Sequence, residues 1–278
     1  MLNIIDAGKK FGSMNSSSIN YQNLTLRDKA YLMEHYGAEV LDLRDIDLTP
    51  QIKRELFEIN REELGKHYGF SGKKMFMADQ VKQDGSYFEI TEEYVRENPS
   101  GWTDIPEDIL IITDKVPEVV IGHPVADCRV VMVADYKKRA VAIAHCSAAF
   151  VDKRMPEMVV DALKRAYDSH DNDLIAYIGS GAGKGWQYDN YPAWATDRSL
   201  WNEAIYQNEE GKFQIDMRKV IVNQLRKSGV SMITGSSVDT LTDDGYFSNS
   251  RSSAKGGNDP SKAGRNFTGT YYSRGRYE

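Results

Sequence analysis

Residues 124–150 read PVADCRVVMVADYKKRAVAIAHCSAAF, and this stretch contains both cysteines of the chain, Cys128 and Cys146. Two apolar runs flank the polar sequence DYKK, which is typical of two antiparallel strands joined by a short turn. If the loop is the four residues 135–138, paired positions sum to 273 and Cys128 lies directly opposite His145. Side chains at such positions share a face of the sheet, with Cβ atoms about 4.5–5.5 Å apart. The hairpin thus predicts a shared thiol–imidazole site, with Cys146 on the other face.

Cys128 also fits a purely structural role, because cysteine often packs as a small hydrophobic residue. A thiol and an imidazole at the expected distance could instead share a metal ion or a proton. A one-residue error in the loop would move the two side chains to opposite faces. The pattern by itself leaves both interpretations open.

The composition indicates an ordinary globular protein of 278 residues, 41% hydrophobic and 27% charged. We expect one domain over residues 1–278, because no repeat or linker divides the chain. The net charge of −6 argues against a general affinity for nucleic acid or anionic membranes. No long apolar run, signal core or disulfide framework is present. We therefore expect a cytoplasmic protein that binds a small molecule, with no nucleic-acid, membrane or protein partner.

Apolar periodicity predicts a mixture of helices and strands without strict alternation, which favours an α+β sheet covered by helices. Helices are expected over residues 26–36, 50–69, 156–170 and 216–229, the last beginning at a capping Asp216. We expect a solvated chain end from Gly245 onward. Strands are expected near residues 39–43 and within 73–81, 87–91, 108–114, 118–122, 129–134, 139–145, 173–180 and 230–236.

Several segments resemble, in order, those of the laccase-domain family, also called multicopper polyphenol oxidase-like, which includes the peptidoglycan editing factor. VADCRVVMVAD and AVAIAHCSAAF resemble the family's ADC and AHAGWRG strands. DQVKQDG takes the place of RQVHGD, and LIAYIGSGAGKGWQYD that of AWIGPAIGPCCYEVG. YFSNSRSSAKGG, with AGRNF after it, is similar to FFSHRRDGG…TGRMA. The resemblance covers about residues 50–270 and leaves residues 1–49 unmatched.

The resemblance implies a mixed-sheet α/β/α-type sandwich, shared with the catalytic domain of cytotoxic necrotising factor toxins. It also implies a metal, usually zinc and less often copper, held by one cysteine and two histidines. Cys128 and His145 match two of these ligands, whereas the third falls on Lys82. The family's Trp-Arg pair falls on Ala148 and Ala149, so an anion-binding arginine is missing.

Further candidates come from the same comparison. His123, five residues before Cys128, could replace the missing metal ligand, or could be a solvent-facing loop histidine. Arg251 and Arg265 match family positions near the substrate. GSGAGKG does not have the spacing of a P-loop or of GxGxxG, but Gly181 and Gly183 could contact an anion or a ribose, or form a plain flexible turn.

Several functions remain open at this point. The first is a zinc enzyme that acts on purine nucleosides by phosphorolysis or deamination, with Cys128, His145 and Lys82 as catalytic residues. The second is a metal-free hydrolase or deamidase with Cys128 as nucleophile and His145 as base. The resemblance also allows polyphenol oxidation, cell-wall precursor editing, or a binder of nucleosides without catalysis.

Overall fold

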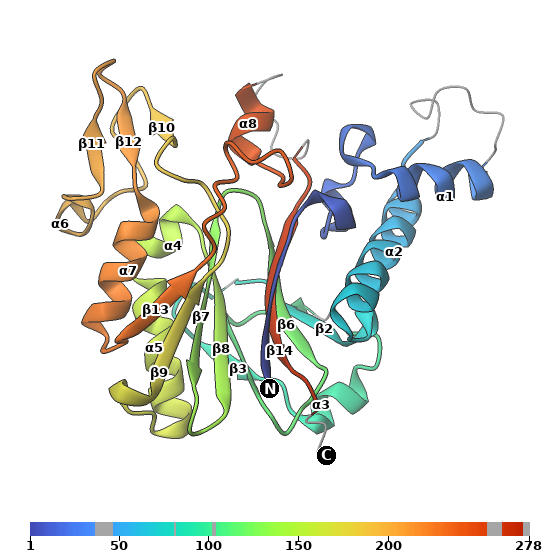
Figure 1. The fold of residues 1–278 in the computed structure, drawn as a ribbon, viewed down its shortest axis with the longest axis horizontal. Coiled ribbons are helices and arrows are strands. Elements are labelled where there is room, and N and C mark those ends of the chain that lie inside the picture. The colour runs from blue at the N-terminus through green and yellow to red at the C-terminus, as the bar shows by residue number, and fades with distance from the viewer. Residues whose placement is uncertain (37–46, 81, 102–103, 255–262, 275–278) are drawn as a thin grey trace.

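The computed structural model describes residues 1–36, 47–80, 82–101, 104–254 and 263–274 (Figure 1). Within these residues, a five-stranded and a six-stranded sheet pack face to face, and helices cover their outer sides. The expected mixed-sheet α+β sandwich with helices outside is therefore confirmed. Its β layer consists of two sheets, which the sequence did not indicate.

The six-stranded sheet has the order β13 (Met232–Gly235), β9 (Leu174–Ile178), β7 (Arg129–Asp135), β8 (Ala140–Cys146), β5 (Ile109–Thr113) and β3 (Tyr87–Glu89). The five-stranded sheet has the order β1 (Leu2–Ala7), β14 (Asn266–Tyr272), β6 (Val120–Val125), β2 (Met75–Ala78) and β4 (Asp104–Ile105). A small third sheet contains β10 (Gln187–Tyr188), β12 (Phe213–Ile215) and β11 (Ile205–Gln207). The helices are α1 (Leu26–Tyr36), α2 (Pro50–Tyr68), α3 (Glu92–Glu97), α4 (Ala148–Asp152), α5 (Met155–Tyr167), α6 (Arg198–Trp201), α7 (Met217–Lys227) and α8 (Asn249–Ala254).

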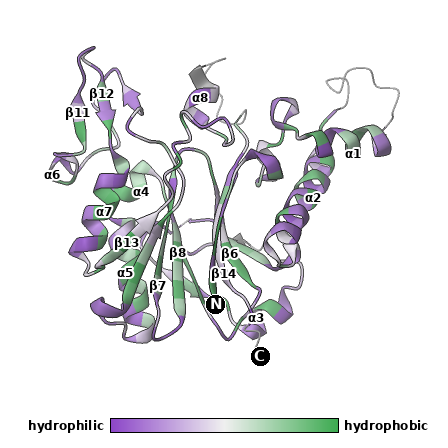
Figure 2. Ribbon diagram, viewed as in Figure 1, coloured by the Kyte–Doolittle hydropathy of each residue, from purple (hydrophilic) through white to green (hydrophobic). Residues whose placement is uncertain are grey.

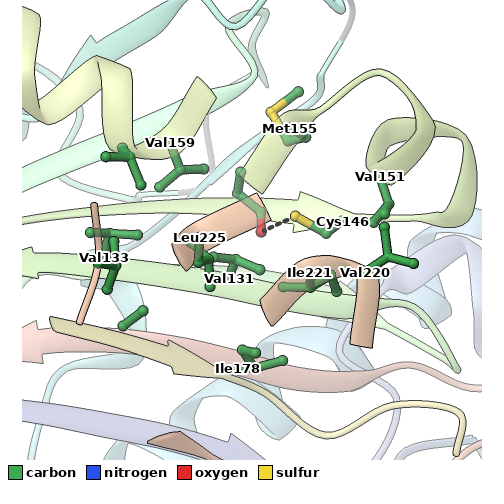
Figure 3. Packing of buried hydrophobic residues seen from close by; sticks show 14 of the residues in the cluster. Val131, Val133, Cys146, Val151, Met155, Val159, Ile178, Val220, Ile221 and Leu225 are labelled. Atoms are coloured by element: carbon green, nitrogen blue, oxygen red, sulfur yellow. Dashed lines mark hydrogen bonds between the residues drawn. The ribbon is translucent and has the colours of Figure 1, made fainter. Parts of the chain in front are cut away.

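Strands β7 and β8 lie at the centre of the six-stranded sheet and are buried on both faces. Val131 and Val133 pack beneath helices α5 and α7 (Figure 3). Val130 and Met132 point the other way, into the apolar layer between the two sheets. This double burial explains why the strands read as continuous apolar runs rather than as an alternating pattern.

The register of the β7–β8 hairpin differs from the expected one by two positions. Asp135 pairs with Ala140, so paired positions sum to 275 and the loop is Tyr136–Arg139. The Asp135 carboxylate accepts hydrogen bonds from the backbone N–H groups of Lys137 (2.9 Å) and Lys138 (2.8 Å). An aspartate that caps a turn in this way extends the ladder to its own position, so the expectation that Asp135 begins the loop was wrong.

The residues predicted to begin and end helices do so in the structure. Helix α2 begins after Thr49, whose side chain accepts a hydrogen bond from the Ile52 N–H, and ends at Gly69 in the left-handed conformation. Helix α7 begins after Asp216, whose carboxylate accepts from the Lys219 N–H. Figure 2 shows hydrophilic and hydrophobic residues interspersed along these outer helices. No helix in the described part of the chain combines the length and the apolar composition needed to cross a bilayer.

The C-terminal region differs most from expectation. Strand β14 lies between β1 and β6, and all seven of its residues are buried, including Tyr271 and Tyr272. The prediction of a solvated chain end is therefore wrong for residues 266–272. Pairing with β1 and β6 supplies the backbone hydrogen bonds of this segment, which follows a stretch rich in Ser and Gly. The strand predicted near residues 39–43 lies outside the described residues.

Substitution of Phe267 tests how much β14 contributes to the stability of the fold. Its ring is fully buried and lies over Gly122 and Gly269, where an added Cβ would approach it to 2.3 Å and 2.6 Å. We expect Phe267→Ala to lower the free energy of unfolding by about 3–5 kcal/mol, measured by urea denaturation. Tyr206→Ala, at a position 45% exposed, should change it by only about 0.5 kcal/mol. Equal losses in both variants would contradict a structural role for β14.

Candidate functional site

Three candidate side chains come from strands of both sheets. Cys128 immediately precedes β7, His145 lies on β8, and His123 lies on β6 of the five-stranded sheet. His145 pairs with Val130 rather than with Cys128, so the thiol lies one diagonal step away along the strand. A two-residue shift keeps a side chain on the same face. Cys128 packs with Val130 in the layer between the sheets, so the prediction that Cys128 and His145 share a face is confirmed.

Cys146 lies on the opposite face of the sheet, as expected. Its side chain is fully buried among Val151, Met155 and Ile221 beneath the helices (Figure 3). Its thiol donates a long hydrogen bond to the carbonyl oxygen of Ala144, with sulfur and oxygen 3.9 Å apart. Cys146 is therefore a core residue that takes no part in the Cys128 site.

His123 is a buried strand residue and not a solvent-facing loop histidine. It is 2% exposed, and strand β6 pairs with β14 directly beside it. The centres of the His123 and His145 rings are 6.1 Å apart across the gap between the sheets. The face-to-face packing of the two sheets thus brings together two histidines that are 22 positions apart in the sequence.

Burial keeps all three groups electrically neutral near pH 7. It raises the pKa of the Cys128 thiol to about 12, and the neighbouring Asp127 charge acts in the same direction. Burial also lowers the pKa of His145 to about 4, with a further contribution from Arg265. The pKa of His123 falls to about 3 through burial and the proximity of His145. A thiolate–imidazolium pair is therefore disfavoured in the free protein.

The two imidazoles each keep a buried Nε2 atom that has no hydrogen-bond partner among the described residues. Such atoms are uncommon, because leaving a buried polar group unsatisfied costs about 1–3 kcal/mol. Neutral imidazoles and a thiol are also the donor types that zinc prefers, so the donor set fits that metal.

The spacing of these donors is not that of a formed metal site. In the described part of the chain, no three His, Cys, Asp or Glu side chains lie close enough together to hold an ion as they stand. Two imidazoles on one zinc have ring centres roughly 5 Å apart, given Zn–N distances of about 2.0–2.1 Å. The 6.1 Å separation of the two histidine rings would have to shorten by about 1 Å for both to bind one ion.

Asp127 fixes the backbone that carries Cys128. Its φ of 76° lies in the left-handed region, which aspartate tolerates better than most residues. Its carboxylate accepts hydrogen bonds from the Thr240 hydroxyl (2.8 Å) and the Ser250 N–H (2.7 Å). Its carbonyl oxygen accepts from the Ala182 N–H at 2.8 Å. Three distant segments therefore hold Asp127, which the sequence did not single out beyond its place in the ADC motif.

Charged and aromatic side chains surround the thiol and the imidazole. Arg265 lies close enough that its charge acts on the pKa of both Cys128 and His145. The Phe150 ring centre is 6.2 Å from that of His145. Burial raises the pKa of Tyr188, whose ring lies against Trp186 and Trp194 on the helix side of the sheet. The site therefore has a cation and one aromatic ring near its donors, and the sequence indicated only the cation.

Arg251 braces a loop rather than facing Cys128. Its guanidinium donates hydrogen bonds to the carbonyl oxygens of Asp243 (3.1 Å) and Tyr246 (2.5 Å). It also lines a cavity of about 790 Å³ between the N-terminal segments and α8, which Cys128, His145 and His123 do not line. Substrate binding by Arg251 stays a prediction.

Lys82 is held by a carboxylate. Its Nζ atom is 2.6 Å from Glu107, and the hydrogen bond between them raises the pKa of Lys82. Lys82 therefore stays an ammonium, which cannot bind a metal. Nearby, Gln80 Nε2 donates a hydrogen bond of 2.9 Å to the carbonyl oxygen of His145. The DQVKQDG segment thus contacts the His145 strand, while a catalytic role for Lys82 stays a prediction.

The glycines of GSGAGKG permit close packing. A Cβ at Gly181 would lie 2.6 Å from Arg129 Cγ, and one at Gly183 would lie 2.1 Å from a carboxylate oxygen of Asp239. The Gly183 N–H already donates to Asp239 at 2.8 Å. An anion at Gly183 would therefore compete with an internal carboxylate. Ligand contacts at Gly181 and Gly183 stay a prediction.

The sequence matches the family described as multi-copper polyphenol oxidoreductase laccase over residues 45–266, well over half of the chain. The chain belongs to this laccase family. Its structure is similar to the crystal structure of the hypothetical protein YfiH from Bacillus licheniformis, with a TM-score of 0.62 and 20% sequence identity. The similarity covers 79% of this chain and 82% of the YfiH chain. It is also similar to the crystal structure of YlmD from Geobacillus stearothermophilus, with a TM-score of 0.65 and 18% sequence identity. This similarity covers 80% of this chain and 82% of the YlmD chain. No curated protein matches.

The family match confirms the resemblance inferred from the ordered motifs. The structural neighbours share the fold of the laccase-family chain, and at 18–20% identity they show the fold alone.

The reactivity of Cys128 tests the electrostatics of the site. With a pKa of about 12, the thiol should react with iodoacetamide on the order of a hundredfold more slowly than glutathione at pH 7.5 in metal-free protein. The rate should keep rising to pH 10, because the thiolate fraction grows as pH approaches the pKa. Cys128→Ser should abolish labelling, since Cys146 is fully buried. Fast labelling that levels off near pH 7 would instead indicate a thiolate–imidazolium pair.

Proposed function

We propose that this laccase-family chain is an enzyme that acts on a purine nucleoside, by phosphorolysis or deamination, at the site of Cys128, His145 and His123. The observation that carries this proposal is the pair of buried imidazole Nε2 atoms that have no hydrogen-bond partner in the described part of the chain, next to a free thiol. Buried polar atoms in folded proteins normally have a partner, so these atoms suit an ion or a ligand.

Zinc is the metal that best fits these donors. Cys128, His145 and His123 would hold it, and when bound it would activate a water molecule or a phosphate for attack. Both histidines are already in the neutral form that a metal requires, because burial lowers the pKa of each. The Cys128 thiol would release its proton on binding the metal. Copper, which the family description names, is the alternative.

The neighbours of the site favour a flat, aromatic substrate. Phe150 offers a ring surface near His145, and purine bases stack well on such rings. Arg265 supplies positive charge that acts on Cys128 and His145, which suits a phosphate or an oxygen that becomes negative during the reaction. These residues bind and orient the substrate in our proposal, and Arg265 stabilises the charge that develops.

Turnover should be slow compared with relatives that carry the full motif. In the motif resemblance, Ala148 and Ala149, which begin α4, align with the family's Trp-Arg pair. Removing one positioned donor typically costs about 2.7–4 kcal/mol, or roughly 10²–10³ in rate. The metal-free hydrolase receives less support, because burial opposes the thiolate that it needs.

Zinc binding tests the role of His123. We expect purified protein to contain zinc by elemental analysis, and His123→Ala to weaken zinc affinity at least roughly 10–100-fold, because a lost ligand should cost no less than a lost supporting contact. The exposed His170→Ala is the matched control and should bind zinc normally. Unchanged affinity in His123→Ala, together with a gain in Lys82→His, would place the third ligand at position 82 instead.

Activity tests the substrate class. Wild-type protein should convert inosine, adenosine or methylthioadenosine slowly in the presence of phosphate, as followed by chromatography of the released base or the deaminated product. Cys128→Ser should lose that turnover, whereas Cys146→Ser should retain it if it folds, because Cys146 lies on the other face of the sheet. Nucleoside binding without turnover would identify a binder, and equal turnover in wild type and Cys128→Ser would remove Cys128 from the mechanism.

A further inference from the structure

A second cluster of polar side chains surrounds Arg129, on the opposite face of the sheet from Cys128. A cavity of about 390 Å³ opens between the GSGAGKG loop and helix α7. Small-molecule pockets typically have volumes of about 300–1,000 Å³. Among its described lining residues, Asp216 alone is acidic, whereas five are cationic: Arg129, Lys184, Arg218, Lys219 and Arg226.

Arg129 is the buried member of this cationic cluster. It is 3% exposed, and its guanidinium donates to the carbonyl oxygens of Gly179 (2.8 Å) and Ala182 (3.0 Å). Its Nε atom is buried and has no hydrogen-bond partner among the described residues. Burial lowers the pKa of Arg129 to about 10, and the like charge of Arg218 adds to this effect. The negative charges of Asp239, Asp216 and Asp6 partly offset this positive charge, and of these three aspartates only Asp216 lines the cavity.

The acids near this cavity offset only part of that charge. Lys184 Nζ is 3.6 Å from Asp216, and Lys219 Nζ is 3.1 Å from Glu203. Arg218 donates to the carbonyl oxygen of Ser236, and neither Arg218 nor Arg226 forms an ion pair within the described residues. In a chain whose net charge is −6, this local excess of cations indicates an anionic ligand.

The chemistry of the cluster favours a phosphoryl group over a single carboxylate. Guanidinium groups bind phosphate oxygens in pairs, and a phosphate offers more acceptor oxygens and more charge than a carboxylate. Two backbone amides of the loop that line the cavity already have internal partners. The Ala182 N–H is bound to the Asp127 carbonyl oxygen, and the Gly183 N–H to Asp239. Recognition would therefore come from the arginine and lysine side chains.

We propose that the cavity between the GSGAGKG loop and α7 binds a phosphoryl group, either as inorganic phosphate or as the phosphate of a small ester. Arg129 lies next to Cys128 in sequence, but its side chain points to the opposite face of the strand. The phosphoryl site is therefore separate from the Cys128 site and does not depend on the function proposed for it.

Calorimetric titration and thermal melting test this site with inorganic phosphate, AMP and adenosine at matched ionic strength. We expect phosphate or AMP to bind and to raise the melting temperature of wild-type protein beyond a chloride control. Binding of AMP but not adenosine would identify an ester, and binding of phosphate alone would identify the free anion. No binding of either phosphate-containing probe would overturn the proposal.

Variants locate the binding. Arg226→Gln should weaken it roughly tenfold and the double variant Arg218→Gln with Arg226→Gln roughly a hundredfold, because a charge-assisted hydrogen bond is worth about one tenfold step. Arg226 is exposed, so Arg226→Gln should fold even if the double variant does not. Arg96→Gln on α3 makes the same charge change and should bind like wild type, as should Cys128→Ser. Unchanged binding in Arg226→Gln, or an equal loss in Arg96→Gln, would refute the assignment.

Discussion

Seven residue pairs hold β7 against β8 at the centre of the six-stranded sheet, and both faces of this ladder are buried. A slip of one residue would turn every side chain to the wrong layer, so double burial specifies the register strongly. The register of this ladder therefore determines which side chains point to each face of the sheet. Cys128 and His145 point between the sheets, whereas Arg129 and Cys146 point toward the helices.

The two faces offer different environments at the same end of the sheet. Between the sheets, burial keeps a thiol and two imidazoles neutral, and two imidazole nitrogen atoms have no hydrogen-bond partner among the residues that the structure describes. On the helix side, a buried arginine lies among other cations beside a glycine loop. A backbone hydrogen bond connects the two regions, because the Ala182 N–H donates to the carbonyl oxygen of Asp127. Neutral soft donors suit a metal, and clustered guanidinium groups suit an anion.

Membership of the laccase family accounts for the architecture, which persists at 18–20% identity to the solved neighbours. The motif resemblance aligns Lys82 with a family histidine, and Ala148 and Ala149 with a Trp-Arg pair. Lys82 is ion-paired at the surface, whereas Ala148 is buried in the core at the start of α4.

Local sequence determined the elements whose signals are local. Helix α2 follows from Thr49, Pro50 and Gly69, and the central strands follow from their apolar runs, because capping groups and continuous hydrophobic residues act within a few positions. The family motifs also identified Cys128 and His145. The turn register was missed by two positions, since the sequence does not show that the Asp135 side chain caps the turn.

Only the tertiary structure decided the rest, because it depends on contacts between residues far apart in the chain. Strand β14 contains Phe, Thr and Tyr residues that favour strands, but only its pairing with β1 and β6 places it inside a sheet. His123 meets His145 because two sheets pack face to face, and Arg129 meets Arg218 because α7 lies against the glycine loop. The sequence by itself determined which donors and charges the chain carries. Packing determined which of them meet, since burial and long-range pairing have no counterpart in local spacing.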